Sequence, residues 1–191
     1  MFVRLTDLAA HSTWWELAGH ETESLRDAWR LCHHAAQPAA EFAKAFGIPE
    51  ADDSHSAMQW VPGRRIIDGY FRGRMVETPR GVACTALRPV DLTLFLIKPI
   101  GDLYAEMPLE GKTIEQAHGW VLTTTMNLFD VPVRQATEPA PDLPQHAVAN
   151  GEQVGSPNQL ALIEVVRLYE TTASLLDAFG QARVQATDSS E

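Results

Sequence analysis

The sequence predicts an α+β fold: an antiparallel or mixed β-sheet of about four to five strands, covered by N-terminal, middle and C-terminal helices. Residues 90–97 form the most apolar run of the chain, which is rich in residues that pack on a pleated surface and too short for a buried helix. Residues 6–46 and 158–180 carry apolar residues at intervals of three and four. The apolar run therefore predicts a central strand that needs cover on both faces, and the flanking segments predict helices that supply it.

Length and composition favour one soluble domain. The chain has 191 residues, of which 45% are hydrophobic and 21% charged, as in an ordinary globular protein. We expect a single domain over residues 1–182 and a disordered polar tail after it. The expected parts are a helical region (1–47), a β meander (48–112), two helices with a proline-rich connection (113–182) and the tail (183–191).

Charge and cysteine content argue against several function classes. The formal net charge of -10 opposes binding to a phosphate backbone, so we expect no nucleic-acid partner. The N-terminus lacks the features of a signal peptide, and no apolar run approaches the roughly 20 residues of a membrane helix, so we expect no membrane partner. Two cysteines without metal or redox spacing predict a reducing, cytoplasmic setting.

The N-terminal helices are predicted over residues 6–46. Glycine is unfavourable inside a helix, and proline removes a hydrogen bond and clashes with the preceding turn. Gly19 and Pro38 therefore predict two or three segments rather than one rod, and Gly47 is expected to cap the last segment. Residues 48–57 are polar and lack periodicity, which predicts a loop.

The predicted sheet begins at residues 58–78, where positions 64–75 alternate between mostly apolar and mostly polar side chains. Residues 82–87 add another strand. The central hairpin spans 90–112, with its turn at 99–102. On the second arm, a period of two places these residues on one face: Leu103, Ala105, Met107 and Leu109.

A middle helix is predicted after the hairpin. Thr113 and Gln116 have the spacing of a capping box, so the helix should begin at Ile114 and end near Phe129. Residues 130–157 hold several prolines and few periodic apolar positions, which predicts a long connection that is a surface loop or a lid.

The last helix is predicted over residues 158–180. Asn158 is its expected N-cap and Gly180 its expected end. One face should pack on the sheet: Leu160, Ile163, Val166, Tyr169, Ala173, Leu176 and Phe179.

Asp52-Asp53-Ser54-His55 places two carboxylates and an imidazole in one predicted loop. These groups suit a hard metal ion or acid and base chemistry. A metal would need further ligands, such as His118 or His146, because four adjacent residues cannot complete a coordination shell. The alternatives are a capping turn around a hydrogen-bonded histidine, which is the commoner arrangement, and a polar pocket without metal.

A group of arginines follows this loop, close to Trp60. Arginine forks on one strand face can bind an anionic ligand. A solvated strand at a sheet edge uses the same residues for solubility, which is the role we favour. The group consists of Arg64, Arg65, Arg72, Arg74 and Arg80.

The sequence contains no Gly-x-Ser-x-Gly motif of hydrolases, no Gly-x-Gly-x-x-Gly motif of dinucleotide-binding proteins and no His-Glu-x-x-His motif of zinc proteases. Gly111-Lys112-Thr113 is similar to the end of a phosphate-binding loop, but Glu106 occupies the position of the first glycine. A capped turn accounts for these residues equally well. Whether the protein is an enzyme stays open.

The pattern from 52 to 180 resembles an uncharacterised bacterial family of conserved hypothetical proteins that carry an Asp-Asp-Ser-His loop. In that family the chain continues past the last helix into a segment with paired histidines and an aspartate, which this chain lacks. The resemblance implies no known reaction, but it draws attention to Asp53, His55 and His146. The matching pieces are 52–55 with Trp60, 92–94, 109–113 with Ala117 and Trp120, 143–146, and the last helix with Tyr169 and 175–176.

Our leading hypothesis is that the protein binds a small polar ligand in a pocket between residues 52–55 and 140–148. In an enzyme, His55 or His146 would be the general base, because the unperturbed pKa of histidine lies nearest neutrality, and Asp53 would orient it. We assign no metal ligand and leave any cofactor unknown. The expected ligand-binding residues are Asp52, Trp60 and Arg72.

The alternative hypothesis is a non-catalytic interaction or oligomerisation module. The last helix or the arginine-bearing strand face would then form the contact. The partners that these two hypotheses allow are a small molecule and a second copy of the chain in a homodimer.

Overall fold

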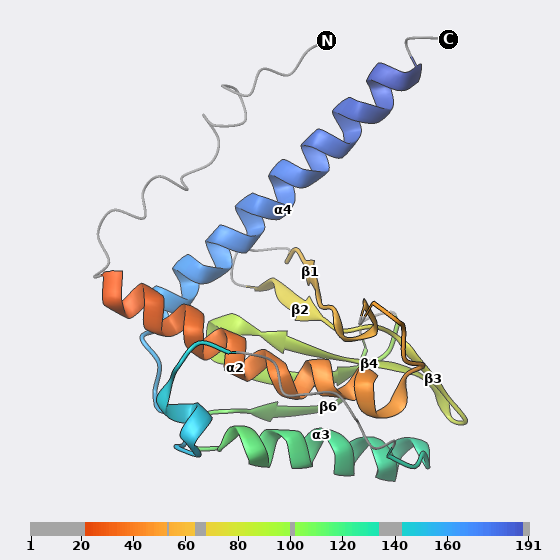
Figure 1. Ribbon diagram of the computed structural model, residues 1–191, viewed down its shortest axis with the longest axis vertical. Helices are drawn as coiled ribbons and strands as arrows, with labels where there is room; N and C mark the ends of the chain where they lie inside the picture. The colour runs from red at the N-terminus through yellow and green to blue at the C-terminus, as the bar shows by residue number, and fades with distance from the viewer. Residues whose placement is uncertain (1–21, 53, 64–67, 100–101, 134–142, 189–191) are drawn as a thin grey trace.

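Over the residues that the structure describes, the sheet is antiparallel and has six strands, more than the four or five expected. Five strands lie in the order β1-β2-β4-β5-β6, and β3 pairs with β4 beside β2. The α+β fold predicted from the sequence is confirmed (Figure 1). The strands are β1 (Gln59–Val61), β2 (Tyr70–Arg72), β3 (Val76–Thr78), β4 (Gly81–Arg88), β5 (Thr93–Ile97) and β6 (Leu103–Pro108).

The structure is a computed structural model. It describes residues 22–52, 54–63, 68–99, 102–133 and 143–188, with the backbone alone for 182–188. The predicted helix before residue 22, the catalytic candidate Asp53, the arginines at 64 and 65 and the end of the tail at 189–191 lie outside these ranges.

The predicted central hairpin is formed by β5 and β6, but its register contains an irregularity. Leu96 is opposite Ala105, whereas Ile97 is opposite Leu103, so Tyr104 is an extra residue in β6. Tyr104 packs edge-on against Phe129, with ring centroids 4.9 Å apart. The expectation that Leu103 lies on one face with Ala105 is therefore wrong, and Leu103 is 50% exposed.

The central strand β5 is buried under the helices on one face, as expected, but on the other face its Phe95 is only partly buried and no described helix covers it. The larger of two core clusters lies under the helices and includes Leu94 and Leu96. The smaller one joins Cys84, Ala86 and Ile97 on the other face. The helices therefore all pack on the same core, which also contains Phe42, Leu87, Val121, Phe129, Leu162 and Val165.

Helix α2 (Thr22–Phe46) continues through Pro38, where the sequence predicts a break. Pro38 has no N–H to donate to the carbonyl of His34, which is unfavourable inside a helix. Burial outweighs this loss, because Pro38, Ala35 and Ala39 all face the core.

The contact between α2 and β4 is close because small residues form it. The hydroxyl of Thr85 donates a hydrogen bond to the carbonyl of Ala39 at 2.6 Å. The N–H of Gly73 donates to the carbonyl of Thr85 at 2.9 Å. A Cβ at Gly73 would lie 3.3 Å from Thr85 Oγ1 and 3.6 Å from the Ala39 carbonyl oxygen, so a side chain at this position would have little room beside Thr85.

Helix α3 (Ile114–Phe129) begins with the predicted capping box. The Thr113 hydroxyl accepts from the N–H of Gln116 at 3.1 Å, and the Gln116 side chain accepts from the N–H of Thr113 at 2.9 Å. Asp130 ends the helix in the left-handed conformation. α3 packs beside α2 (Figure 1).

Helix α4 (Gln159–Asp188) is longer than predicted. Asn158 caps it as expected, because its side chain accepts from the N–H of Ala161 at 3.2 Å. The predicted end at Gly180 is wrong, since the helix continues to Asp188. Among the described residues, no helix is both long and apolar enough to cross a membrane. Short 3-10 turns complete the fold: η2 (Ser54–Ser56), η4 (Pro89–Asp91) and η5 (Ala147–Asn150).

We predict that Ala39→Leu lowers the free energy of unfolding by about 1–3 kcal/mol, because the added methylenes have no room between α2 and β4. Urea unfolding followed by circular dichroism measures the change. Gln37→Leu on the same helix is the control, and it should stay within about 0.5 kcal/mol of the wild type. Equal stability of the two variants would contradict the close contact.

Candidate functional site

The described residues of the 52–55 loop, Asp52, Ser54 and His55, make local hydrogen bonds just after α2. Oδ1 of the exposed Asp52 accepts a hydrogen bond from the backbone N–H of Ser54 at 3.1 Å. The Ser54 side chain and this backbone bond hold the pKa of Asp52 below its usual value. His55 is buried, and its Nδ1 accepts from the N–H of Glu50 at 3.2 Å. These contacts are those of the capping turn that was one alternative from the sequence.

His146 lies in the connection before α4, where two histidines hold that connection on α2. Nδ1 of His146 accepts from the N–H of Val148 at 3.2 Å, so the neutral ring carries its proton on Nε2, 3.3 Å from Oδ1 of Asp27. His34, buried on α2, has its Nε2 2.7 Å from the carbonyl of Pro144. The two imidazole centroids are 5.9 Å apart.

The structure does not bring the two catalytic candidates together. His55 follows the C-terminal end of α2, whereas His146 lies beside the N-terminal half of the same helix. Figure 1 shows the connection at η5 and the loop after α2 near opposite ends of α2. A single pocket between 52–55 and 140–148 is therefore not what these contacts form.

The expected ligand-binding residues Trp60 and Arg72 lie on opposite faces of the sheet. β1 and β2 pair with Trp60 opposite Phe71 and Gln59 opposite Arg72, and neighbouring side chains on a strand alternate. Trp60 stacks on Tyr169 of α4 at a centroid distance of 5.4 Å. Nη2 of Arg72 donates to Oε1 of Gln59 at 3.0 Å on the other face.

Within the arginine group, Arg74 and Arg80 each pair with a different acid, and Arg72 pairs with Gln59, so the described members have separate partners. Nη2 of Arg74 lies 2.9 Å from Glu50, and Nη2 of Arg80 lies 3.3 Å from Asp130. In the part of the chain that the structure describes, no three His, Cys, Asp or Glu side chains gather as ligands for a metal ion.

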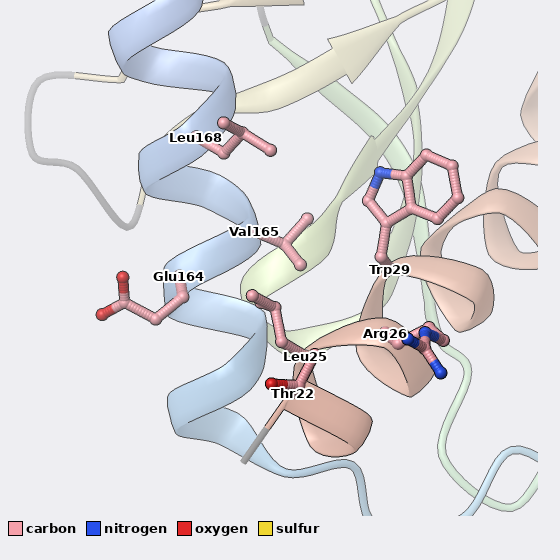
Figure 2. A pocket seen from close by; sticks show the side chains of 7 residues that line it. All are labelled: Thr22, Leu25, Arg26, Trp29, Glu164, Val165 and Leu168. Atoms are coloured by element: carbon pink, nitrogen blue, oxygen red, sulfur yellow. The ribbon is translucent and has the colours of Figure 1, made fainter. Parts of the chain in front are cut away.

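An apolar groove lies between the N-terminal half of α2 and the start of α4. Its volume is about 330 Å³. Figure 2 shows the side chains of Leu25, Trp29, Val165 and Leu168 converging between the two helices. The lining residues are Thr22, Leu25, Arg26, Trp29, Glu164, Val165 and Leu168.

The two charged residues at this groove are engaged elsewhere. Arg26 lies 2.6 Å from Glu23 on its own helix. The carboxylate of Glu164 lies 2.8 Å from Nη1 of Arg167 and points away from the groove (Figure 2). The groove therefore offers apolar side chains to whatever enters it.

Hydrogen bonding and aromatic contacts next to the groove hold α2 and α4 in place relative to each other and to the sheet. A hydrogen bond from the Trp29 side chain partly offsets the effect of burial, which raises the pKa of Tyr169. Tyr169 also packs edge-on against Phe71 of the sheet, at 4.6 Å. Burial, together with the neighbouring His34, lowers the pKa of His33, whose ring lies 4.1 Å from that of Trp29. Both helices are thus anchored next to the groove.

The apolar surface of the groove continues along α4. We call Val165, Leu168, Thr172, Leu176 and Phe179 the α4 stripe. At 100° per residue, these side chains fall within about 80° of one another around the helix. Val165 is buried, but Leu168 is 44%, Leu176 65% and Phe179 57% exposed.

The α4 stripe follows the helix out of the body of the protein. Figure 1 shows the C-terminal half of α4 extending beyond the sheet, and no other described element lies beside its far end. Of the face predicted from the sequence, Val166 is buried, but Leu160, Leu176 and Phe179 are exposed. The signal that sequence reasoning missed is the spacing of three, four, four and three along 165–179.

We predict that His55→Ala lowers the free energy of unfolding by about 1–3 kcal/mol, because it removes the acceptor of the Glu50 N–H. Thermal and urea unfolding measure the loss. Asp52→Asn is the control, because the amide oxygen can still accept from Ser54, and it should be close to neutral. A His55→Ala variant as stable as the wild type would argue against a structural role for this ring.

The chain matches no protein-family model, no curated protein and no solved structure. The resemblance to the family with the Asp-Asp-Ser-His loop stays a prediction.

Proposed function

We propose that the protein is a helix-docking module: the groove between α2 and α4, together with the α4 stripe, binds an amphipathic helix. This is the interaction alternative from the sequence, placed on the last helix. The observation that carries it is one apolar surface that begins buried in the core at Val165 and ends exposed at Phe179. Helices that bind in apolar grooves use such surfaces.

The length of the surface favours a helix over a small molecule. From Val165 to Phe179 the surface extends about 21 Å along α4, at 1.5 Å per residue. A small ligand fills a pocket, whereas a second helix can cover this whole length. The apolar lining also fits a small polar ligand poorly, because such a ligand needs polar groups to fix it.

The projecting part of α4 itself argues for a partner. Helices gain most of their stability from packing an apolar face, and isolated short helices are marginal in water. Between 171 and 181 the only ionisable side chain is Asp177, so few ion pairs along the helix can replace that packing. A docked helix would cover Leu176 and Phe179 and hold this segment helical.

Charge disfavours a membrane surface as the occupant. Amphipathic helices that bind membranes carry lysine and arginine on the polar face. Between 171 and 181, α4 carries one charged side chain, the acidic Asp177, and the whole chain has a net charge of -10. Protein is the better match for this apolar surface.

The polar residues expected to form a ligand pocket already have local roles. Asp52 and His55 shape the turn after α2, and His146 holds the connection against Asp27. The proposed docking function uses none of them. Its surface is built from residues of α2 and α4 alone.

We predict that Leu168→Glu raises the half-saturating concentration of the fluorescent apolar probe bis-ANS about tenfold, because a carboxylate in the groove must lose water when the probe binds. The titration uses submicromolar protein, and circular dichroism checks that the fold is retained. Leu160→Glu is the matched control: it adds the same charge to the same helix at an exposed position off the stripe. Equal probe binding by both variants would overturn the proposed docking surface.

A further inference from the structure

We infer that the docked helix is α4 of a second copy of this chain, lying antiparallel along the α4 stripe. The inference rests on the proposed function and names its partner. It follows from the symmetry of the stripe, from its lack of charge and from the shape of the protein.

The α4 stripe is symmetric about Thr172. Leu168 and Leu176 lie four residues before and after it, and Val165 and Phe179 lie seven residues before and after it. A twofold axis at Thr172 therefore pairs each member with its counterpart in an antiparallel copy. Such an isologous contact requires one surface that complements itself.

This pairing brings the most exposed aromatic side chain of α4 to the groove. Phe179 of the second copy would lie beside Val165 and Leu168, which line the groove together with Trp29. Leu176 of the second copy would lie against Leu168. In both copies, the exposed C-terminal end of the α4 stripe would thus be covered by the groove of the other copy.

The centre of the stripe can be buried without an unpaired polar group. The hydroxyl of Thr172 donates to the carbonyl of Leu168 in its own helix at 2.8 Å. Its methyl group is then the part that a second Thr172 meets. Burying this residue at a helix contact leaves no donor without an acceptor.

Neighbouring charges do not oppose self-association. The residues that flank the exposed part of the stripe are Tyr169, Ala173 and Leu175, whereas Glu170 and Asp177 lie on the opposite side of the helix. Two identical stripes can therefore meet without like charges in contact. In paired helices, charged residues beside the apolar seam usually select a partner of a different sequence over a second copy. The residues that flank the α4 stripe between 168 and 179 are uncharged, so they do not select against a second copy.

The antiparallel direction follows from the position of the sheet, α2 and α3, which together we call the body of the protein. The sheet and the other helices lie at the N-terminal end of α4 (Figure 1). A parallel pair would place two bodies, each in a chain with a net charge of -10, at the same end of the helix pair. An antiparallel pair separates them, which lowers their mutual repulsion.

The first test is the mass of the full chain in solution, by light scattering after gel filtration at about 100 µM, well above a micromolar Kd. The wild type should have twice the chain mass of 21.1 kDa. Phe179→Glu should have the single-chain mass, and Ser174→Glu, on the opposite face of α4, should keep the double mass. A monomeric wild type overturns the inference, and so does a Phe179→Glu dimer or a Ser174→Glu monomer.

The second test determines the direction of the helix pair by disulfide formation in two variants, each of which adds one cysteine on α4 to the native Cys32 and Cys84. Thr172→Cys should form a cross-linked dimer, because the two positions meet at the axis. Phe179→Cys should form no cross-linked dimer, because in an antiparallel pair the two residues at position 179 lie about 21 Å apart along the helix axis. Background reaction is small, since burial raises the pKa of Cys32 to about 12 and that of Cys84 to about 11. A cross-linked Phe179→Cys dimer would overturn the antiparallel arrangement.

These outcomes separate the inference from the proposed function. A monomeric wild type whose bis-ANS binding is still weakened by Leu168→Glu would leave the docking surface in place and remove the second copy as its occupant. Probe binding that no stripe variant changes would remove the docking surface itself.

Discussion

The close contact between α2 and β4 is the constraint on which the rest of the structure depends. Ala39 and Thr85 meet through a hydrogen bond between the threonine hydroxyl and the helix carbonyl, and Gly73 closes the same contact from the neighbouring segment. With α2 held on the sheet, α3 packs along it and α4 packs against its N-terminal half. The position of the groove and the direction in which α4 leaves the body both follow from this contact.

Local patterns predicted the elements whose causes are local. The alternation and turn residues of 90–112 gave the β5–β6 hairpin, and Thr113 with Gln116 gave the start of α3. The predicted break at Pro38 and the predicted helix end at Gly180 were wrong because a local sequence pattern does not show how a helix is packed. Proline costs about 3 kcal/mol and glycine about 1 kcal/mol in a helix. Burial of the helix around Pro38 outweighs the first penalty, and the second is small enough for α4 to continue through Gly180 to Asp188.

The candidate site could be predicted only in part, because residue type does not show which residues are neighbours. Asp52, His55 and His146 are chemically versatile, but the same groups build turns and hold loops, and the structure uses them in that way. The groove depends on where two helices from opposite ends of the chain cross. The α4 stripe was visible as a spacing of three and four, but periodicity alone does not tell a face that packs inside the molecule from one that awaits a partner.

Amide hydrogen exchange of residues 171–181 at two protein concentrations tests the central claim most directly. If a second copy covers the α4 stripe, exchange in this segment should slow as the concentration rises from about 1 µM to about 100 µM, because the population of open helix falls with dimer formation. Exchange in the core strand β5 should stay unchanged and serves as the internal control. Exchange of 171–181 that is the same at both concentrations would contradict the account.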